Sequence, residues 1–323
     1  MRELEMIRGA RILVDECANV KPGENVLIVA DTNYVHIAQI LAAVARERDT
    51  EVVICIMTPR KAHGENPPPT IVSAMMEADV IFEPTTYSLT RSEATEQARR
   101  KGARIVSMPA YTDDMLIHGG LEADFRAQEK LVDELADALT RSRFAKLMAP
   151  AGTCLTLETG DRHANTGKGF CTGPGTVSGP PNIEVNVSPI EGTAEGTIVV
   201  DVSVPIPEIG LLGSPIKLTV EKGRIVDIEG GHEATTLQRI LEEAGDPNVY
   251  NIAELGIGLN PKARISGIML EDEGALGTAH IGIGDNHTSG GVIKAPLHID
   301  LVIRNPTLEL DGRVVIKEGD ILI

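Results

Sequence analysis

Short apolar runs alternate with segments of helical periodicity over the first half of the chain. Apolar runs bounded by turn residues predict buried strands at 26–30, 51–57, 80–82 and 104–108. Apolar residues at helical spacing predict helices at 3–19, 34–47, 70–77, 92–101 and 121–147. Strands that alternate with helices of this length indicate an open parallel α/β sheet with helices on both faces.

The composition changes after residue 150 to glycine, proline, threonine and valine with the alternation of strands, for example over 196–204. One further helix is expected at about 233–244. We place the boundary near 148–152 and predict two domains: a Rossmann-like α/β domain at 1–149 and a mainly β metal-binding domain at 150–323. Neither a G-x-G-x-x-G turn after the first strand nor a P-loop motif is present, so the sequence does not indicate nucleotide binding.

Charge and composition exclude several classes of partner. The net charge of −17 repels nucleic-acid backbones and anionic lipid, and the aromatic content of 2% leaves few platforms for base stacking. The charged N-terminus and the lack of a long apolar stretch predict neither a signal peptide nor a membrane span. The four cysteines form no CxxC pair, which fits a reduced, cytoplasmic protein.

The strongest candidate chemistry is the run Pro296–Ile303, which contains His298 and Asp300. Side chains two positions apart leave the same face of a strand about 6.5–7 Å from each other. His298 and Asp300 can therefore converge on one cation, and imidazole with carboxylate suits zinc, manganese, cobalt or ferrous iron. A His-x-Asp pair alone is also compatible with an aspartate that only orients the histidine.

Three more potential ligands lie in glycine-marked strands of the same half. Glu184 shares a strand face with Asn186, Glu254 precedes Gly256 and Gly258, and His280 lies beside glycines that permit close backbone approach. Together with His298 and Asp300 they make five candidate ligands. Five ligands are enough for two metals with a bridging carboxylate.

The order of these segments resembles the M29 aminopeptidases (aminopeptidase T and its relatives) and the related 2,5-dihydroxypyridine 5,6-dioxygenases. The resemblance rests on Ile183–Pro189, Ala253–Gly258, Thr278–Gly284 and His298–Asp300, and it spans most of 150–312. It implies that Glu184, Glu254, His280, His298 and Asp300 bind metal, and that the protein is a homodimer. Three features depart from the peptidases: no glycine precedes Glu184, the stretch between His280 and His298 is short, and no tyrosine follows His280.

The main interpretation is a metallo-aminopeptidase acting on short peptides. Two ions, zinc, cobalt or manganese, would polarise the substrate carbonyl and activate a water, with Glu184 or Glu254 as proton shuttle. The alternative is a ring-cleaving dioxygenase with one Fe(II) held by His298, Asp300 and His280. Retention of both glutamates favours the hydrolase, whereas the missing tyrosine and the chain length favour the dioxygenase. A non-catalytic metal or small-ligand binding protein is the third possibility.

Two further segments near the candidate site are open to more than one interpretation. His287 follows His280 in a loop and is a weak candidate for substrate binding. The acidic run Glu271-Asp272-Glu273 is interpreted as a solvated turn, although one of these acids could face the cations.

Overall fold

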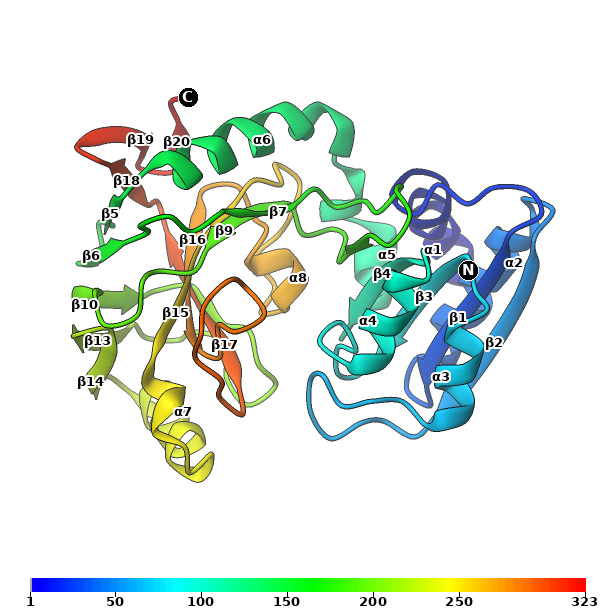
Figure 1. Ribbon diagram of the computed structural model, residues 1–323, viewed down its shortest axis with the longest axis horizontal. Helices are drawn as coiled ribbons and strands as arrows, with labels where there is room; N and C mark the ends of the chain where they lie inside the picture. Colours follow the sequence, from blue (N-terminus) through cyan, green and yellow to red (C-terminus); the bar gives the residue numbers. More distant parts are fainter. Residues whose placement is uncertain (1) are drawn as a thin grey trace. The chain divides into compact units, whose positions relative to one another are not determined.

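The computed structural model describes residues 2–323, which form two compact units (Figure 1). Unit 1 contains the chain up to Phe125 together with Gly167–Pro181, and unit 2 contains Arg126–Thr166 and Asn182–Ile323. The sequence-based division at 149/150 differs from this, because residues 126–149 lie with unit 2 and residues 167–181 return to unit 1.

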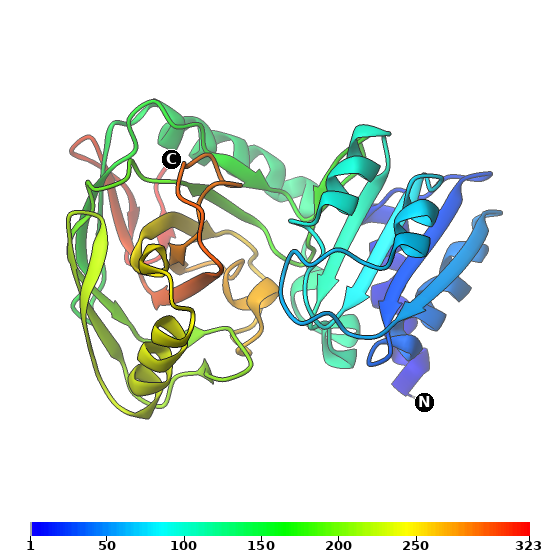
Figure 2. The ribbon, with the colours of Figure 1, turned by 60° about the horizontal axis from the view of Figure 1, so that its bottom comes forward.

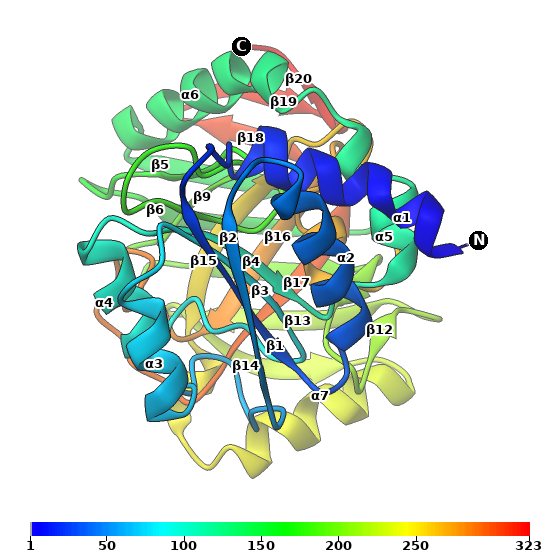
Figure 3. The same ribbon diagram turned by 90° about the vertical axis from the view of Figure 1, so that its right-hand side faces the viewer.

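Unit 1 is built on a parallel sheet with the strand order β2-β1-β3-β4-β8. Its helical and strand elements are α1 (Arg2–Arg11), the π-helical η1 (Ile12–Cys17), β1 (Asn25–Asp31), α2 (Val35–Arg46), β2 (Glu51–Met57), α3 (Pro69–Met75), β3 (Val80–Thr85), α4 (Glu93–Arg100), β4 (Arg104–Pro109), α5 (Asp113–Ile117), η2 (Gly120–Glu122) and β8 (Val177–Ser178). Helices α1 and α2 cover one face, and α3 and α4 cover the other (Figure 3). The predicted α/β sheet is confirmed.

The apolar runs that predicted these strands form the core of unit 1. Leu27, Ile81 and Ile105 come from three adjacent strands and pack with Met75 of α3 and Ala98 of α4. Burial on both faces explains why these strands are continuously apolar instead of alternating.

Unit 2 contains two antiparallel sheets, with strand orders β14-β13-β10-β6-β5-β18-β19-β20 and β12-β11-β17-β16-β15-β9-β7. Its elements are α6 (Phe125–Arg141), β5 (Phe144–Met148), β6 (Cys154–Glu158), β7 (Asn165–Gly167), β9 (Glu184–Val187), β10 (Glu195–Val200), β11 (Ser203–Val204), β12 (Gly210–Leu211), β13 (Ile216–Glu221), β14 (Arg224–Glu229), α7 (His232–Glu243), η3 (Pro247–Tyr250), β15 (Ile252–Gly258), α8 (Met269–Asp272), β16 (Thr278–Gly284), β17 (His298–Arg304), β18 (Thr307–Leu310), β19 (Arg313–Lys317) and β20 (Asp320–Ile321). Helix α7, predicted at 233–244, packs along β13 and β14 (Figure 2).

Two predicted elements are wrong in extent. The helix predicted over 121–147 ends at Arg141, where the Ser142 hydroxyl donates to the Leu139 carbonyl at 2.8 Å. Residues 144–148 then form β5, because Ala145 and Leu147 alternate inward and the strand pairs with β6 and β18. The single strand predicted over 196–204 is two strands, β10 and β11, which lie in different sheets.

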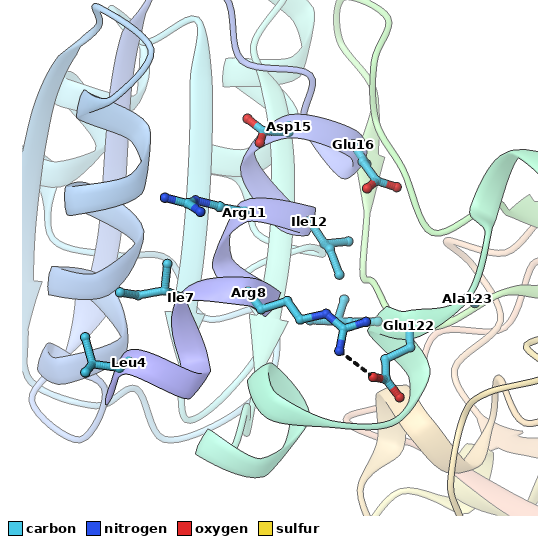
Figure 4. Close-up of a pocket in the computed structure, with 10 residues that line it drawn as sticks. Leu4, Ile7, Arg8, Arg11, Ile12, Asp15, Glu16, Glu122 and Ala123 are labelled. Atoms are coloured by element: carbon cyan, nitrogen blue, oxygen red, sulfur yellow. Dashed lines mark ion pairs between the residues drawn. The ribbon is translucent and has the colours of Figure 1, made fainter. Parts of the chain in front are cut away.

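Within residues 2–323, no helix has the length and apolar character needed to cross a membrane. The expected cytoplasmic location and homodimer stay predictions. A shallow pocket of unit 1 lies between α1, η1 and η2, where Arg8 pairs with Glu122 at 3.0 Å (Figure 4). Neither the histidines nor the carboxylates proposed as ligands line it.

Glu83 is a fully buried acid in the centre of β3. The Thr95 hydroxyl donates to Oε1 at 3.3 Å, and Oε2 has no hydrogen-bond partner among the residues that the structure describes. Burial raises the pKa of Glu83 to about 8. The protonated acid is therefore the form that fits the sheet at neutral pH.

The substitution Glu83→Gln should stabilise the protein at neutral and alkaline pH. Because the folded-state pKa is raised, the stability contributed by Glu83 is complete below about pH 4.5 and is lost as the pH rises through about 8. Relative to wild type, the free energy of unfolding of the variant should rise by about 1.4 kcal/mol per pH unit across that window. Urea unfolding at several pH values measures this difference. Glu77→Gln, at a largely exposed acid, is the control. A difference in unfolding free energy between Glu83→Gln and wild type that does not vary with pH would show that Glu83 does not take up a proton on folding.

Candidate metal centre

Four adjacent strands of the seven-stranded sheet in unit 2 carry the five candidate ligands. Glu184 lies on β9, Glu254 on β15, His280 on β16, and both His298 and Asp300 on β17. The register pairs Gly256 with His280, and Gly282 with both Glu254 and Asp300. Since paired residues share a face, all five ligands project from one face of the sheet. The intervening residues, such as Leu255, Ile281 and Leu301, are fully buried on the opposite face.

The five side chains form two groups that share Glu254. In one group, His280 Nε2 lies 3.4 Å from Glu184 Oε2 and 3.5 Å from Glu254 Oε1. In the other, His298 Nε2 lies 3.7 Å from Glu254 Oε2 and 3.4 Å from Asp300 Oδ1. The ligand atoms within each group lie within 4.8 Å of one another. The structure therefore brings all five residues together, with His280 and the His298–Asp300 pair on either side of Glu254.

Glycines on the ligand face make room for the imidazoles. A Cβ built on Gly256 would overlap the ring of His280. A Cβ built on Gly282 would lie 2.7 Å from Cβ of Glu254 and 2.8 Å from Cε1 of His298. Both glycines are therefore required by the space that the histidines occupy.

Hydrogen bonds orient one ligand in each group. His298 Nδ1 donates a hydrogen bond to the carbonyl of Asp285 at 2.6 Å, which leaves Nε2 directed at Glu254 and Asp300. Asn186 Nδ2 donates to Glu184 Oε1 at 3.1 Å and leaves Oε2 directed at His280.

The loop between β16 and β17 is fixed by side chains from earlier in unit 2. The carbonyl of Ser289 accepts from Asn165 Nδ2 and from the Ser188 hydroxyl, each at 3.1 Å. Glu191 accepts from Asn286 Nδ2 and from the Val292 backbone at 2.9 Å. His287 in this loop is exposed and is not among the five clustered ligands. Its substrate-binding role stays a prediction.

Burial and mutual repulsion strongly perturb the acids of the cluster. Burial raises the pKa of Glu184 to about 7 against the opposing effect of His280, and Glu254 and Asp300 raise it further. Burial would lower the pKa of His280, but the hydrogen bond to Glu254 and the surrounding carboxylates raise it to about 9. Burial would also raise the pKa of Asp300, yet His298 holds it well below its usual range. A proton on His280 thus compensates for carboxylate charge.

The donor set fits a divalent cation. Glu184 Oε2 and Asp300 Oδ1 are buried without a hydrogen-bond partner among residues 2–323. Buried carboxylates need a compensating charge, and a cation between them would take the place of the imidazole protons. The arrangement can therefore bind one divalent ion in either group or two ions that share Glu254.

The interpretation of Glu271-Asp272-Glu273 as a solvated turn is wrong. All three acids are buried, at 0%, 0% and 7% exposure. Burial raises the pKa of Glu273 well above its usual range, and Asp300, Glu184 and Glu254 add to the shift. The charges of the ligand cluster therefore act on Glu273. Three consecutive charged residues have no periodicity that indicates burial. The sequence therefore offered only the open alternative that one of these acids could face the cations.

Comparison with known proteins identifies the family. Residues 13–323 match the family described as 2,5-dihydroxypyridine 5,6-dioxygenase. The 2,5-dihydroxypyridine 5,6-dioxygenase of Pseudomonas putida (strain KT2440) is 30% identical over 262 residues, which cover 77% of this chain and 72% of that protein. The chain belongs to the 2,5-dihydroxypyridine 5,6-dioxygenase family. It is therefore an enzyme, as the sequence predicted, but the match favours our alternative interpretation over the aminopeptidase.

Two solved structures share the fold of this dioxygenase-family member. The structure of 2,5-dihydroxypyridine dioxygenase from Pseudomonas putida KT2440 has a TM-score of 0.85 at 24% identity, covering 99% of this chain and 97% of that one. AmpT from Thermus thermophilus has a TM-score of 0.71 at 14% identity, covering 100% of both chains. The resemblance to M29 aminopeptidases is thus confirmed at the level of the fold.

The substitution Gly282→Ala should weaken metal binding, since the new methyl group would lie 2.7 Å from Cβ of Glu254 and 2.8 Å from Cε1 of His298. We expect the affinity for Mn²⁺, measured by calorimetric titration, to fall at least about tenfold. Thermal unfolding without metal should show that the fold remains. Gly173→Ala is the control, because a Cβ there makes only an ordinary 3.5 Å contact. Equal affinities in both variants would show that Glu254 and His298 do not bind the cation.

Proposed function

We propose that this protein is an Fe(II)-dependent dioxygenase that opens the ring of 2,5-dihydroxypyridine or a close analogue. The observation that carries the proposal is the buried cluster of two imidazoles and three carboxylates, in a chain that matches the dioxygenase family over residues 13–323. The related protein of Pseudomonas putida is named for this reaction.

Glu254, His298 and Asp300 would hold the iron, since their ligand atoms lie within 4.8 Å of one another. A ferrous ion bound there would supply O₂ activation and a chelating position for hydroxyl oxygens of the ring. The Asp285 carbonyl keeps His298 in the tautomer that presents Nε2. This set differs from the expected one, because His280 is grouped with Glu184 and Glu254 and not with Asp300.

Glu184 and His280 would then act on the substrate. Glu184 Oε2, which lies 3.4 Å from His280 Nε2, would accept the proton of a ring hydroxyl, and His280 would stabilise the charge that forms. Asn186 keeps Oε2 of Glu184 free by occupying Oε1. The low exposure of His280 and Glu254 limits the access of water to these groups.

A second candidate function is aminopeptidase-like hydrolysis with two ions. The observation that favours it is that Glu254 belongs to both ligand groups, as a bridging carboxylate would. In that case Glu184 and His280 would be ligands of the second ion and would not act on the substrate.

Metal stoichiometry and substrate assays together separate these functions. Protein purified without oxygen should bind one iron per chain and consume O₂ with 2,5-dihydroxypyridine. Replacement of both His298 and Asp300 by Ala should abolish iron binding and O₂ uptake, because both residues are proposed ligands. His36→Ala, at a histidine outside the cluster that pairs with Asp113, is the control.

Each other result identifies a different function. Two bound zinc, cobalt or manganese ions with release of amino acids from short peptides would establish the hydrolase instead. Tight metal binding without either reaction would indicate a binding protein. Unchanged metal content in the double variant would refute the site itself.

A further inference from the structure

Asn165 is an exposed residue of β7 whose side chain is nevertheless held by two hydrogen bonds. β7 is the neighbour of β9 at the end of the seven-stranded sheet. Asn165 Nδ2 donates to the carbonyl of Ser289 at 3.1 Å and to Oδ1 of Asn186 at 2.9 Å. Asn165 is therefore not a member of the ligand cluster, but it is bonded directly to the residue that bonds Glu184.

The backbone carbonyl of Ser289 determines the orientation of the Asn165 amide. A carbonyl can only accept a hydrogen bond, so Asn165 must direct Nδ2, and not Oδ1, toward it. The Ser289 carbonyl is itself held by the Ser188 hydroxyl, which donates to it at 3.1 Å. Nδ2 carries two hydrogens, and the second one is directed at Asn186.

The orientation of Asn165 determines that of Asn186. Because Asn165 offers an N–H, Asn186 must present Oδ1 to it, and this leaves Nδ2 of Asn186 on the side of Glu184. Nδ2 of Asn186 then donates to Glu184 Oε1 at 3.1 Å. The hydrogen bonds therefore run in one direction, from the Ser289 carbonyl to Glu184.

We propose that Asn165 is a positioning residue that orients Asn186 and thereby holds Glu184 with Oε2 toward His280. An amide that rotates by half a turn exchanges its N–H and C=O ends with almost no change in shape, so Asn186 alone does not ensure that Glu184 meets a donor. The bond from Asn165 selects the one orientation in which it does. The inference rests on the proposed site, but not on whether Glu184 there acts on the substrate or binds a cation.

The substitution Asn165→Asp tests the orientation without changing the shape of the side chain. An aspartate cannot donate to Asn186, so it competes with Glu184 for Nδ2 of Asn186. We compare its effect on the thermal unfolding midpoint of the metal-free, full-length protein in the wild-type and Asn186→Ala backgrounds. The midpoint should fall by at least about 2 °C more in the wild-type background, because Asn186→Ala removes the connection to Glu184. The bond to Ser289 is lost in both backgrounds, so its effect cancels.

Asn305→Asp is the matched control, because it adds the same charge at an exposed asparagine beyond the end of β17 opposite His298. It should shift the midpoint equally in the two backgrounds.

Two further measurements show what Asn165 does for the site. If Glu184 acts on the substrate, Asn165→Asp should lower kcat with 2,5-dihydroxypyridine at least about fivefold. The affinity for Mn²⁺, measured by calorimetric titration, should then stay within about twofold of wild type, since Glu184 is not a ligand in that case. A fall in Mn²⁺ affinity that also depends on Asn186 would support the role of Asn165 and show that Glu184 binds the cation instead.

Two results would overturn the proposal. Equal midpoint shifts by Asn165→Asp in the two backgrounds would show that its effect comes from the loop or from the added charge, and not through Asn186. An unchanged midpoint in the wild-type background would show that Glu184 does not need the orientation. Asn165→Ala removes the donor without adding charge, and it decides the matter by the same comparison if Asn165→Asp does not fold. Failure of ring cleavage in the wild type would affect only the proposed reaction, because the comparison of midpoints needs neither metal nor substrate.

Discussion

Repulsion among buried carboxylates is the constraint around which unit 2 is organised. Glu184, Glu254 and Asp300 are forced to one face of a sheet whose opposite face is fully apolar. In a medium of low dielectric constant, such acids cannot all be ionised without positive charge among them. Protonated His280 or a bound cation would supply that charge. The same constraint explains why the imidazoles lie directly over glycines and contact the acids closely.

The sequence predicted most of unit 1 and the membership of the site. Uninterrupted apolar runs place β1 and β4 within a residue or so, because strands buried on both faces leave that signal. Alternation placed Glu184 and Asn186 on the face opposite Val185, as the structure shows. The prediction that the helix extends to residue 147 was wrong. Ala145 and Leu147 fit both helical and strand spacing, and only the pairing of this segment with β6 and β18 shows that it is a strand.

The division of the site into two groups could not be read from the sequence. Strand register and the direction of each ring decide that His280 lies nearer to Glu184 than to Asp300, and neither has a local signature. The position of Glu273 depends in the same way on α8 and on the approach of Gly274 to Asn182. One fold accommodates proteins named as a dioxygenase and as AmpT. The chemistry is therefore decided by which of these side chains hold metal and which remain free.

The loop between β16 and β17 has a consequence for how members of this family can diverge. Surface loops usually accept insertions because nothing else depends on their path. Here the loop begins at Asp285, whose carbonyl holds His298, and Asn165 bonds both Ser289 in the loop and Asn186, the residue that holds Glu184. If this loop were replaced by that of a homologue without the segments that carry Asn165 and Asn186, the surroundings of His298 and His280 would change. The loop and the metal centre should therefore be exchanged together.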